Sequence, residues 1–132
     1  MAGVSLRSRR SVVPARTVLV RDRGIWTGRL SAWERIDGVW HGHVVWEEDL
    51  RRRRGVVPVH RLRAFDRRWV EVAVLGDWYP GQLVGVRRRP GYDWEGCVQT
   101  WERSGDPGPA QWYAAGEIRQ AERPPPGISE AF

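Results

Sequence analysis

The sequence predicts an all-β protein built from two tandem copies of one small antiparallel domain. Two observations support this prediction: short segments in which every second residue is apolar, and an internal repeat whose parts recur in the same order. Turn-forming pairs such as Asp37-Gly38 separate the segments at intervals of about 8–12 residues, which is typical of small barrels and sandwiches. The sequence shows no amphipathic helix of useful length.

The internal repeat consists of three matched pairs of segments, and their spacing drifts only by loop-sized insertions. The clearest pair joins Gly24-Ile25-Trp26 to Gly76-Asp77-Trp78. A repeat of this length indicates the duplication of a domain of about 50 residues. The matched segments are 24–30 with 76–83, 40–44 with 94–98, and 60–63 with 116–119.

Local composition divides the chain further. The residues before Thr17 are rich in Arg, Ser and Pro without an apolar period, which predicts a flexible basic arm. The Pro- and Gly-rich run at 104–109 predicts a loop that cannot pair in a sheet, and 114–117 suits one helical turn before a last strand at Ile118. The predicted parts are a basic arm at 1–16, a first barrel at 17–66, a second barrel at 67–122 and a proline-rich tail at 123–132.

The positive charge is concentrated in the first half of the chain. All 22 basic residues are arginine, and the net charge is +6. Residues 1–16 hold four arginines and no acid, residues 17–66 hold ten arginines against seven acids, and residues 67–123 hold eight of each. The absence of lysine and asparagine, whose codons are rich in A and T, indicates a GC-rich bacterial genome that accounts for part of the arginine content. The uneven distribution still points to a polyanionic partner for the first half.

Several function classes are excluded by what the sequence lacks. No apolar run reaches the length of about 18 residues that a membrane-spanning helix needs, and no signal peptide is recognisable. With a single cysteine, Cys97, these features predict a cytoplasmic protein without disulfides. The sequence contains no phosphate loop, no nucleophile elbow and no isolated acid pair. We therefore expect neither enzymatic activity nor a cofactor. His41, His43 and His60 complete no familiar metal spacing, and no base activates Cys97.

One stretch carries a family resemblance. Val70-Glu71-Val72, followed by Gly76-Asp77-Trp78-Tyr79-Pro80-Gly81-Gln82-Leu83-Val84, resembles SH3-like barrels of the Tudor and Agenet type, in which a Trp-Tyr-Pro-Gly run opens the second strand. The resemblance covers about residues 17–122. It implies five short strands in each barrel, with a one-turn helix before the fifth. The first copy departs from the pattern at Thr27, which stands in place of the Tyr-Pro pair.

Tudor-type domains hold methylated lysine or arginine in an aromatic cage through cation–π attraction. The resemblance places cage positions at Tyr79 and Trp101 in the second copy and at Trp46 in the first. The loop at 104–108 supplies no aromatic residue, and the chain has no asparagine to complete the cage. The resemblance therefore implies half a cage in each copy.

The tryptophans divide into a recurring and a non-recurring set. Trp26 with Trp78 and Trp40 with Trp94 occupy matched positions, and we expect them to pack the two cores because small barrels depend on large aromatic side chains. For the tryptophans without clean counterparts, core and surface positions both remain open. These are Trp33, Trp101 and Trp112.

The favoured hypothesis is a non-enzymatic binding or adaptor protein that contacts nucleic acid, with DNA preferred, through arginines of its first half. Exposed aromatics such as Trp46 would stack on unpaired bases. For the run at 51–54, a solvated hairpin next to the acids at 47–49 is the alternative. The predicted nucleic-acid-binding residues are Arg7, Arg9, Arg10, Arg51, Arg52, Arg53, Arg54, Arg87, Arg88 and Arg89.

The alternative function is protein–protein interaction without any membrane partner. In that case Trp46, Tyr79 and Trp101 would anchor a peptide or a partner protein, or hold a methylated lysine or arginine. The neutral second copy suits such a partner better than the basic first copy does.

Overall fold

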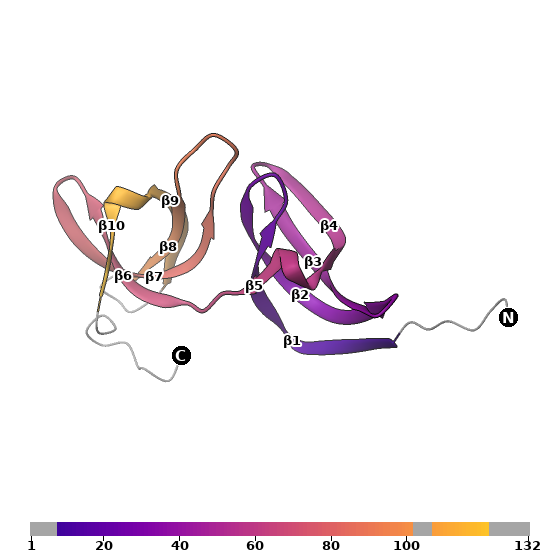
Figure 1. The fold of residues 1–132 in the computed structure, drawn as a ribbon. Helices are drawn as coiled ribbons and strands as arrows, with labels where there is room; N and C mark the ends of the chain where they lie inside the picture. Colours follow the sequence, from indigo (N-terminus) through magenta and orange to yellow (C-terminus); the bar gives the residue numbers. More distant parts are fainter. Residues whose placement is uncertain (1–7, 102–106, 122–132) are drawn as a thin grey trace, which may run out of the picture. The chain divides into compact units, whose positions relative to one another are not determined.

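The computed structural model describes residues 8–101 and 107–121, and it confirms the predicted all-β class (Figure 1). The chain divides into two compact units, Met1–Phe65 and Asp66–Phe132. Each unit contains one five-stranded antiparallel sheet, and one of the two sheets is strongly curled into a half-barrel. Among the described residues, no helix has the length and apolar character needed to cross a membrane.

The first unit is a run of hairpins closed by one helical turn. Its elements are β1 (Ser8–Arg21), β2 (Ile25–Ile36), β3 (Val39–Glu48), β4 (Arg51–Pro58), η1 (Val59–Arg61) and β5 (Leu62–Ala64). The strand order in the sheet is β4-β3-β2-β1-β5. Consecutive strands are therefore neighbours, apart from β5, which crosses to the far edge and pairs with β1.

The second unit repeats this plan. Its elements are β6 (Arg68–Val74), β7 (Asp77–Arg87), β8 (Glu95–Trp101), β9 (Pro107–Ala114), η2 (Ala115–Glu117) and β10 (Ile118–Gln120), in the order β10-β6-β7-β8-β9. The matched sequence segments occupy equivalent elements: β2 with β7, β3 with β8, and η1-β5 with η2-β10. The helical turn predicted before Ile118 is confirmed as η2.

The short connection between the fourth and fifth strands dictates the curvature. β4 and β5 lie at opposite edges of the first sheet, yet only the three residues of η1 separate them. In a flat sheet these edges would be about 19 Å apart, because neighbouring strands are spaced by about 4.8 Å. One turn of this helix type advances only about 6 Å. The sheet therefore has to curl, and η2 makes the same connection between β9 and β10.

The prediction of a flexible arm at residues 1–16 is wrong for residues 8–16. They belong to β1, in which Ser8 to Ser11 pair with Arg35 to Ala32 of β2. The ladder shifts its register between Ser11 and Arg16. This irregularity interrupts the alternation of side chains, so the segment carries no period-two signal although it is a strand.

The Pro- and Gly-rich run at 104–109 is also not wholly a loop. Pro107, Gly108 and Pro109 begin β9, and Pro107 pairs with Trp101 of β8. β9 is an edge strand, so the missing N–H of a proline there removes no ladder hydrogen bond on the open side. Residues 104–106 and the predicted tail at 123–132 lie outside the described residues.

The two cores differ more than the repeat suggests. In the first unit Trp26 and Trp46 are buried together with aliphatic residues, and the Trp26 Nε1 donates to the backbone carbonyl of Asp22 at 3.0 Å. The buried core of the second unit is aliphatic. The prediction that the recurring tryptophans fill both cores is wrong for Trp78 and Trp94, which are 38% and 37% exposed.

Candidate nucleic-acid interface

Three arginines of the first unit project from the sheet face opposite its core, which we call the outer face. In the ladder, Arg54 lies opposite Val45 and Val45 lies opposite Arg29. Side chains that face each other across strands share a side of the sheet, and Arg52 shares the side of Arg54 because successive residues alternate. Both neighbours of Arg29 in β2, Gly28 and Leu30, are buried, so Arg29 points away from the core.

These three outer-face arginines are exposed. Within the part of the chain that the structure describes, the side chains of Arg29, Arg52 and Arg54 form no ion pair and no hydrogen bond. The nearest acid in the ladder is Glu47, which lies opposite Arg52. Their guanidinium groups therefore remain available to an anion from outside.

The other two arginines of the predicted cluster lie on the opposite side of β4. Arg53 lies opposite Trp46, and its Nε is 3.6 Å from Oε2 of Glu48. Arg51 lies opposite Glu48. The alternation of the strand thus divides the run at 51–54 between two faces. On the outer face, Arg52 and Arg54 have Glu47 as their one neighbouring carboxylate in the ladder, whereas Arg51 and Arg53 lie beside Glu48.

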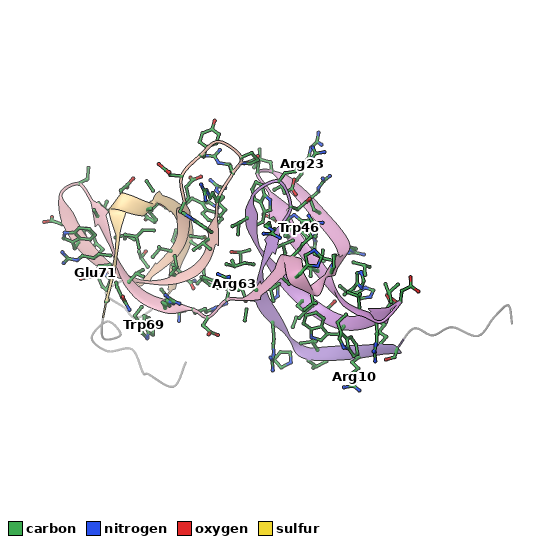
Figure 2. The ribbon with its side chains drawn as sticks, viewed as in Figure 1. Arg10, Arg23, Trp46, Arg63, Trp69 and Glu71 are labelled. Carbon is green, nitrogen blue, oxygen red and sulfur yellow. The ribbon has the colours of Figure 1, made fainter. Side chains whose placement is uncertain are left out.

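The prediction that Trp46 is an exposed stacking or cage residue is wrong. Its side chain is only 6% exposed and belongs to the core of the first unit (Figure 2). Its Nε1 donates to Oε1 of Glu48 at 3.0 Å, so its polar atom is also satisfied within the protein. Trp46 points inward because it alternates with the exposed Glu47 along β3, and a base cannot reach it.

The N-terminal arginines have different environments. Arg9 is exposed and lies opposite Glu34 in the β1–β2 ladder, whereas Arg10 lies opposite Trp33. The guanidinium carbon of Arg10 is 5.7 Å from the ring centroid of Trp40 (Figure 2 labels Arg10). Arg7 lies outside the described residues.

In the second unit, two of the three predicted phosphate-binding arginines are already paired. Arg87 donates from Nε and Nη2 to the carboxylate of Glu95 at 3.3 and 3.2 Å, and Arg89 donates from Nε at 3.0 Å. The hydrogen bond from Arg87 is the main reason that the pKa of Glu95 lies below its usual range. Arg88 is exposed. Arg87 and Arg89 therefore do not offer free guanidinium groups to a phosphate.

Arginines of the second unit also cover its aromatic rings. The pairs are Arg87 on Trp112, Arg88 on Trp94, Arg89 on Tyr92 and Arg119 on Trp78, with distances from guanidinium carbon to ring centroid of 4.1, 6.0, 4.4 and 4.1 Å. A reader of methylated side chains would hold its ligand over such faces. Tyr79, which is 48% exposed, carries no such arginine in the described structure. Trp101 ends β8, and its side chain lies outside the described part.

The histidines and the cysteine are engaged locally. His41 Nδ1 lies 2.9 Å from the carbonyl of Val39, and His43 Nε2 lies 3.3 Å from Oε2 of Glu34. Among the described residues, no three His, Cys, Asp or Glu side chains gather as a metal site. Burial raises the pKa of the Cys97 thiol, which therefore stays protonated near neutral pH.

Sequence reasoning missed Arg29 as an outward-facing residue and expected Trp40 in the core, whereas Trp40 is half-buried and lines a cavity outside the core cluster. Arg29 stands between two buried positions of β2, so its outward direction could have been read from the alternation, but its proximity to Arg54 depends on pairing through β3. Comparison with protein-family models, curated proteins and solved structures found no match for this chain.

Proposed function

We propose that this chain is a non-enzymatic nucleic-acid-binding protein whose first unit holds the phosphate backbone. The observation that carries the proposal is the outer-face set Arg29, Arg52 and Arg54, which is exposed and has no recorded ion pair among the described residues. Guanidinium groups bind phosphate through paired, charge-assisted hydrogen bonds. In the second unit, by contrast, Arg87 and Arg89 are neutralised by Glu95, in line with the even charge balance of that half.

The proposal extends to the barrel type and the location. Four strands in a meander, followed by a one-turn helix and a fifth strand that pairs with the first, support an SH3-like barrel of the Tudor or Agenet type for each unit. Because a fold does not by itself define a function, the proposal depends on the surface arginines rather than on the barrel type. A cytoplasmic location, where DNA is accessible in a bacterial cell, suits this role.

The test is a salt titration of the full chain on random-sequence duplex DNA. Each phosphate contact contributes about 0.9 to the slope of log K against log salt. The triple variant Arg29→Gln, Arg52→Gln and Arg54→Gln should therefore lose roughly 2–3 from that slope between about 50 and 200 mM salt.

A charge-matched control separates the loss of specific contacts from the loss of net positive charge. Three exposed arginines of the second unit that belong to no predicted binding set, Arg67, Arg68 and Arg119, are replaced by glutamine. This control should keep the wild-type slope. Equal slopes for the two triple variants, or no binding by the wild type at about 50 mM salt, would contradict the proposal.

A protein or peptide partner for the second unit is the second candidate. Five of its aromatic side chains are more than a third exposed: Trp78, Tyr79, Tyr92, Trp94 and Trp112. Exposed aromatic groups are common anchors of protein interfaces. Titration with peptides carrying methylated arginine or lysine, with Tyr79→Ala as the comparison, tests the reader version. An unchanged tryptophan fluorescence would exclude it.

A further inference from the structure

The N-terminal half of β1 borders a groove within the first unit. On one edge β1 pairs with β2, but on the other edge β5 covers only Val18 to Val20. The Phe65 N–H adds one bond to the carbonyl of Thr17 at 3.3 Å. In the described structure, the edge from Ser8 to Arg16 has no further strand beside it, and a groove of about 810 Å³ lies there.

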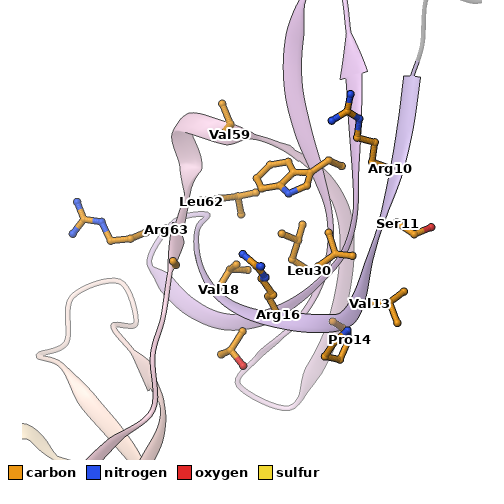
Figure 3. Close-up of a pocket in the computed structure, with 15 residues that line it drawn as sticks. Arg10, Ser11, Val13, Pro14, Arg16, Val18, Leu30, Val59, Leu62 and Arg63 are labelled. Carbon is orange, nitrogen blue, oxygen red and sulfur yellow. The ribbon is translucent and has the colours of Figure 1, made fainter.

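The groove has an apolar floor and a basic rim. Figure 3 shows β1 on one side and the η1–β5 segment on the other, with Val18 and Leu30 between them. The rim carries three exposed arginines, and no carboxylate is among the described lining residues. None of the three has a recorded ion pair among the described residues. They are Arg10, Arg16 and Arg63.

An indole-lined cavity of about 360 Å³ continues the groove at its Arg10 end. It is lined by Arg10, Trp33, Trp40 and Val59, of which the groove shares all but Trp40. Arg10 lies opposite Trp33 in one ladder, and Trp33 lies opposite Gly42 in the next. The side of Gly42 that a Cβ would occupy is filled by Leu30 and Leu62, which close the cavity toward the core. Both tryptophans are only partly buried, so part of each ring stays open to a ligand.

The groove does not suit an added peptide strand. A peptide that pairs with a sheet edge needs regularly spaced N–H and C=O groups along that edge. Pro14 has no N–H to donate, and the register shift between Ser11 and Arg16 removes the segment around it from regular pairing. The edge is therefore interrupted at its centre, whereas arginine side chains and an indole line the groove itself.

We propose that this groove binds a single strand of nucleic acid, with an unpaired base against Trp33 and Trp40 and with phosphates on Arg10, Arg16 and Arg63. A single strand supplies the anionic backbone and the flat apolar groups that this lining complements, and base stacking on aromatic side chains is tolerant of sequence. A duplex hides the faces of its bases, so it would be held by the outer-face arginines alone. The inference rests on the proposed function and adds a preference for unpaired strands.

The test compares a labelled oligothymidylate of about 12 nucleotides, its RNA counterpart and a duplex of equal length on the full chain. Trp40→Ala should weaken single-strand binding by about 5- to 150-fold and leave duplex binding unchanged. The exposed Trp112 of the second unit provides the matched control, and Trp112→Ala should leave both affinities unchanged. Because Trp40→Ala could disturb folding, the double variant Arg10→Gln and Arg16→Gln is measured beside it and should show the same selective loss.

The outcomes separate this inference from the proposed function. If both groove variants bind the single strand as the wild type does, while the outer-face triple variant loses duplex binding, the groove inference is overturned and the function stands. Equal loss on single strand and duplex would also overturn it. Polyglutamate that displaces the oligonucleotide at equal charge concentration would assign the groove to an acidic protein instead. The ratio of DNA to RNA affinity tells which single strand the groove prefers.

Discussion

Gly81→Ala should destabilise the second unit, because a side chain at Gly81 of β7 would collide with β8. A Cβ added there would lie 2.6 Å from Cγ1 of Val98 and 2.9 Å from the carbonyl oxygen of Gln99. Favourable contacts between carbon atoms are about 3.5–4.0 Å long. Val98 is fully buried, and Gln99 is held in the ladder opposite Gln82. Neither group can give way without moving the sheet.

The expected loss follows from two opposing effects. Overpacking of this kind costs about 1–3 kcal/mol, and the stiffer unfolded chain of an alanine variant returns about 0.4–1 kcal/mol. A net loss of roughly 1–2 kcal/mol corresponds to a change of about 5- to 30-fold in the opening equilibrium. Backbone hydrogen exchange in β6, β7 and β8 should accelerate by that factor.

Gly116→Ala provides the control in the same unit, since nothing lies within 4 Å of a Cβ at that position. Its exchange rates should stay at the wild-type level or fall slightly. If Gly81→Ala exchanges as slowly as Gly116→Ala, the close approach of the two strands does not constrain this position, and the packing argument is refuted. Gly28 is the matched position of the first unit, with a Cβ distance of 2.9 Å to the carbonyl of Val45.

Two further predictions concern individual side chains. Trp46→Ala should lower the stability of the first unit by about 3–5 kcal/mol, measured by thermal unfolding, because it empties a core position. An unchanged melting temperature would show that Trp46 does not pack in the core. Because the pKa of Glu95 is lowered in the folded state, its ion pairs stabilise the fold fully at pH values above the ordinary pKa of a glutamate. This stabilisation is lost as the pH falls through the lowered pKa. Glu95→Gln should therefore reduce the urea midpoint at pH 7 but not below about pH 3, and a difference of equal size at both pH values would contradict this linkage.

The repeat made much of the fold predictable. Matched segments have matched local preferences, so the strands, the turns and the helical turn before Ile118 followed from the sequence. The exposure of the tryptophans did not follow. Trp26 and Trp78 occupy matched positions, yet one is buried and the other lies under the guanidinium group of Arg119 at 4.1 Å. Burial depends on what the opposite strands supply, and that differs between the copies.

The candidate site was predictable in charge but not in geometry. The excess of arginine in the first half was visible in the sequence, whereas the division of the run at 51–54 between two faces required the strand register. The sequence showed Glu95 near Arg87 and Arg89, but its ion pairs with both follow from the register of β7 and β8. The groove beside β1 was hidden because residues 8–16 carry no alternating pattern, although pairing with β2 makes them a strand.

The sequence by itself determined the duplication, the all-β class and the half of the chain that carries the positive charge, because each of these is a property of composition or of neighbours along the chain. Only the tertiary structure decided which arginines are free, which tryptophans are buried and where indoles and guanidinium groups meet. Those outcomes depend on cross-strand partners such as Arg10 with Trp33 and Arg87 with Glu95, and the pairing register that brings such partners together is fixed only when the sheet closes.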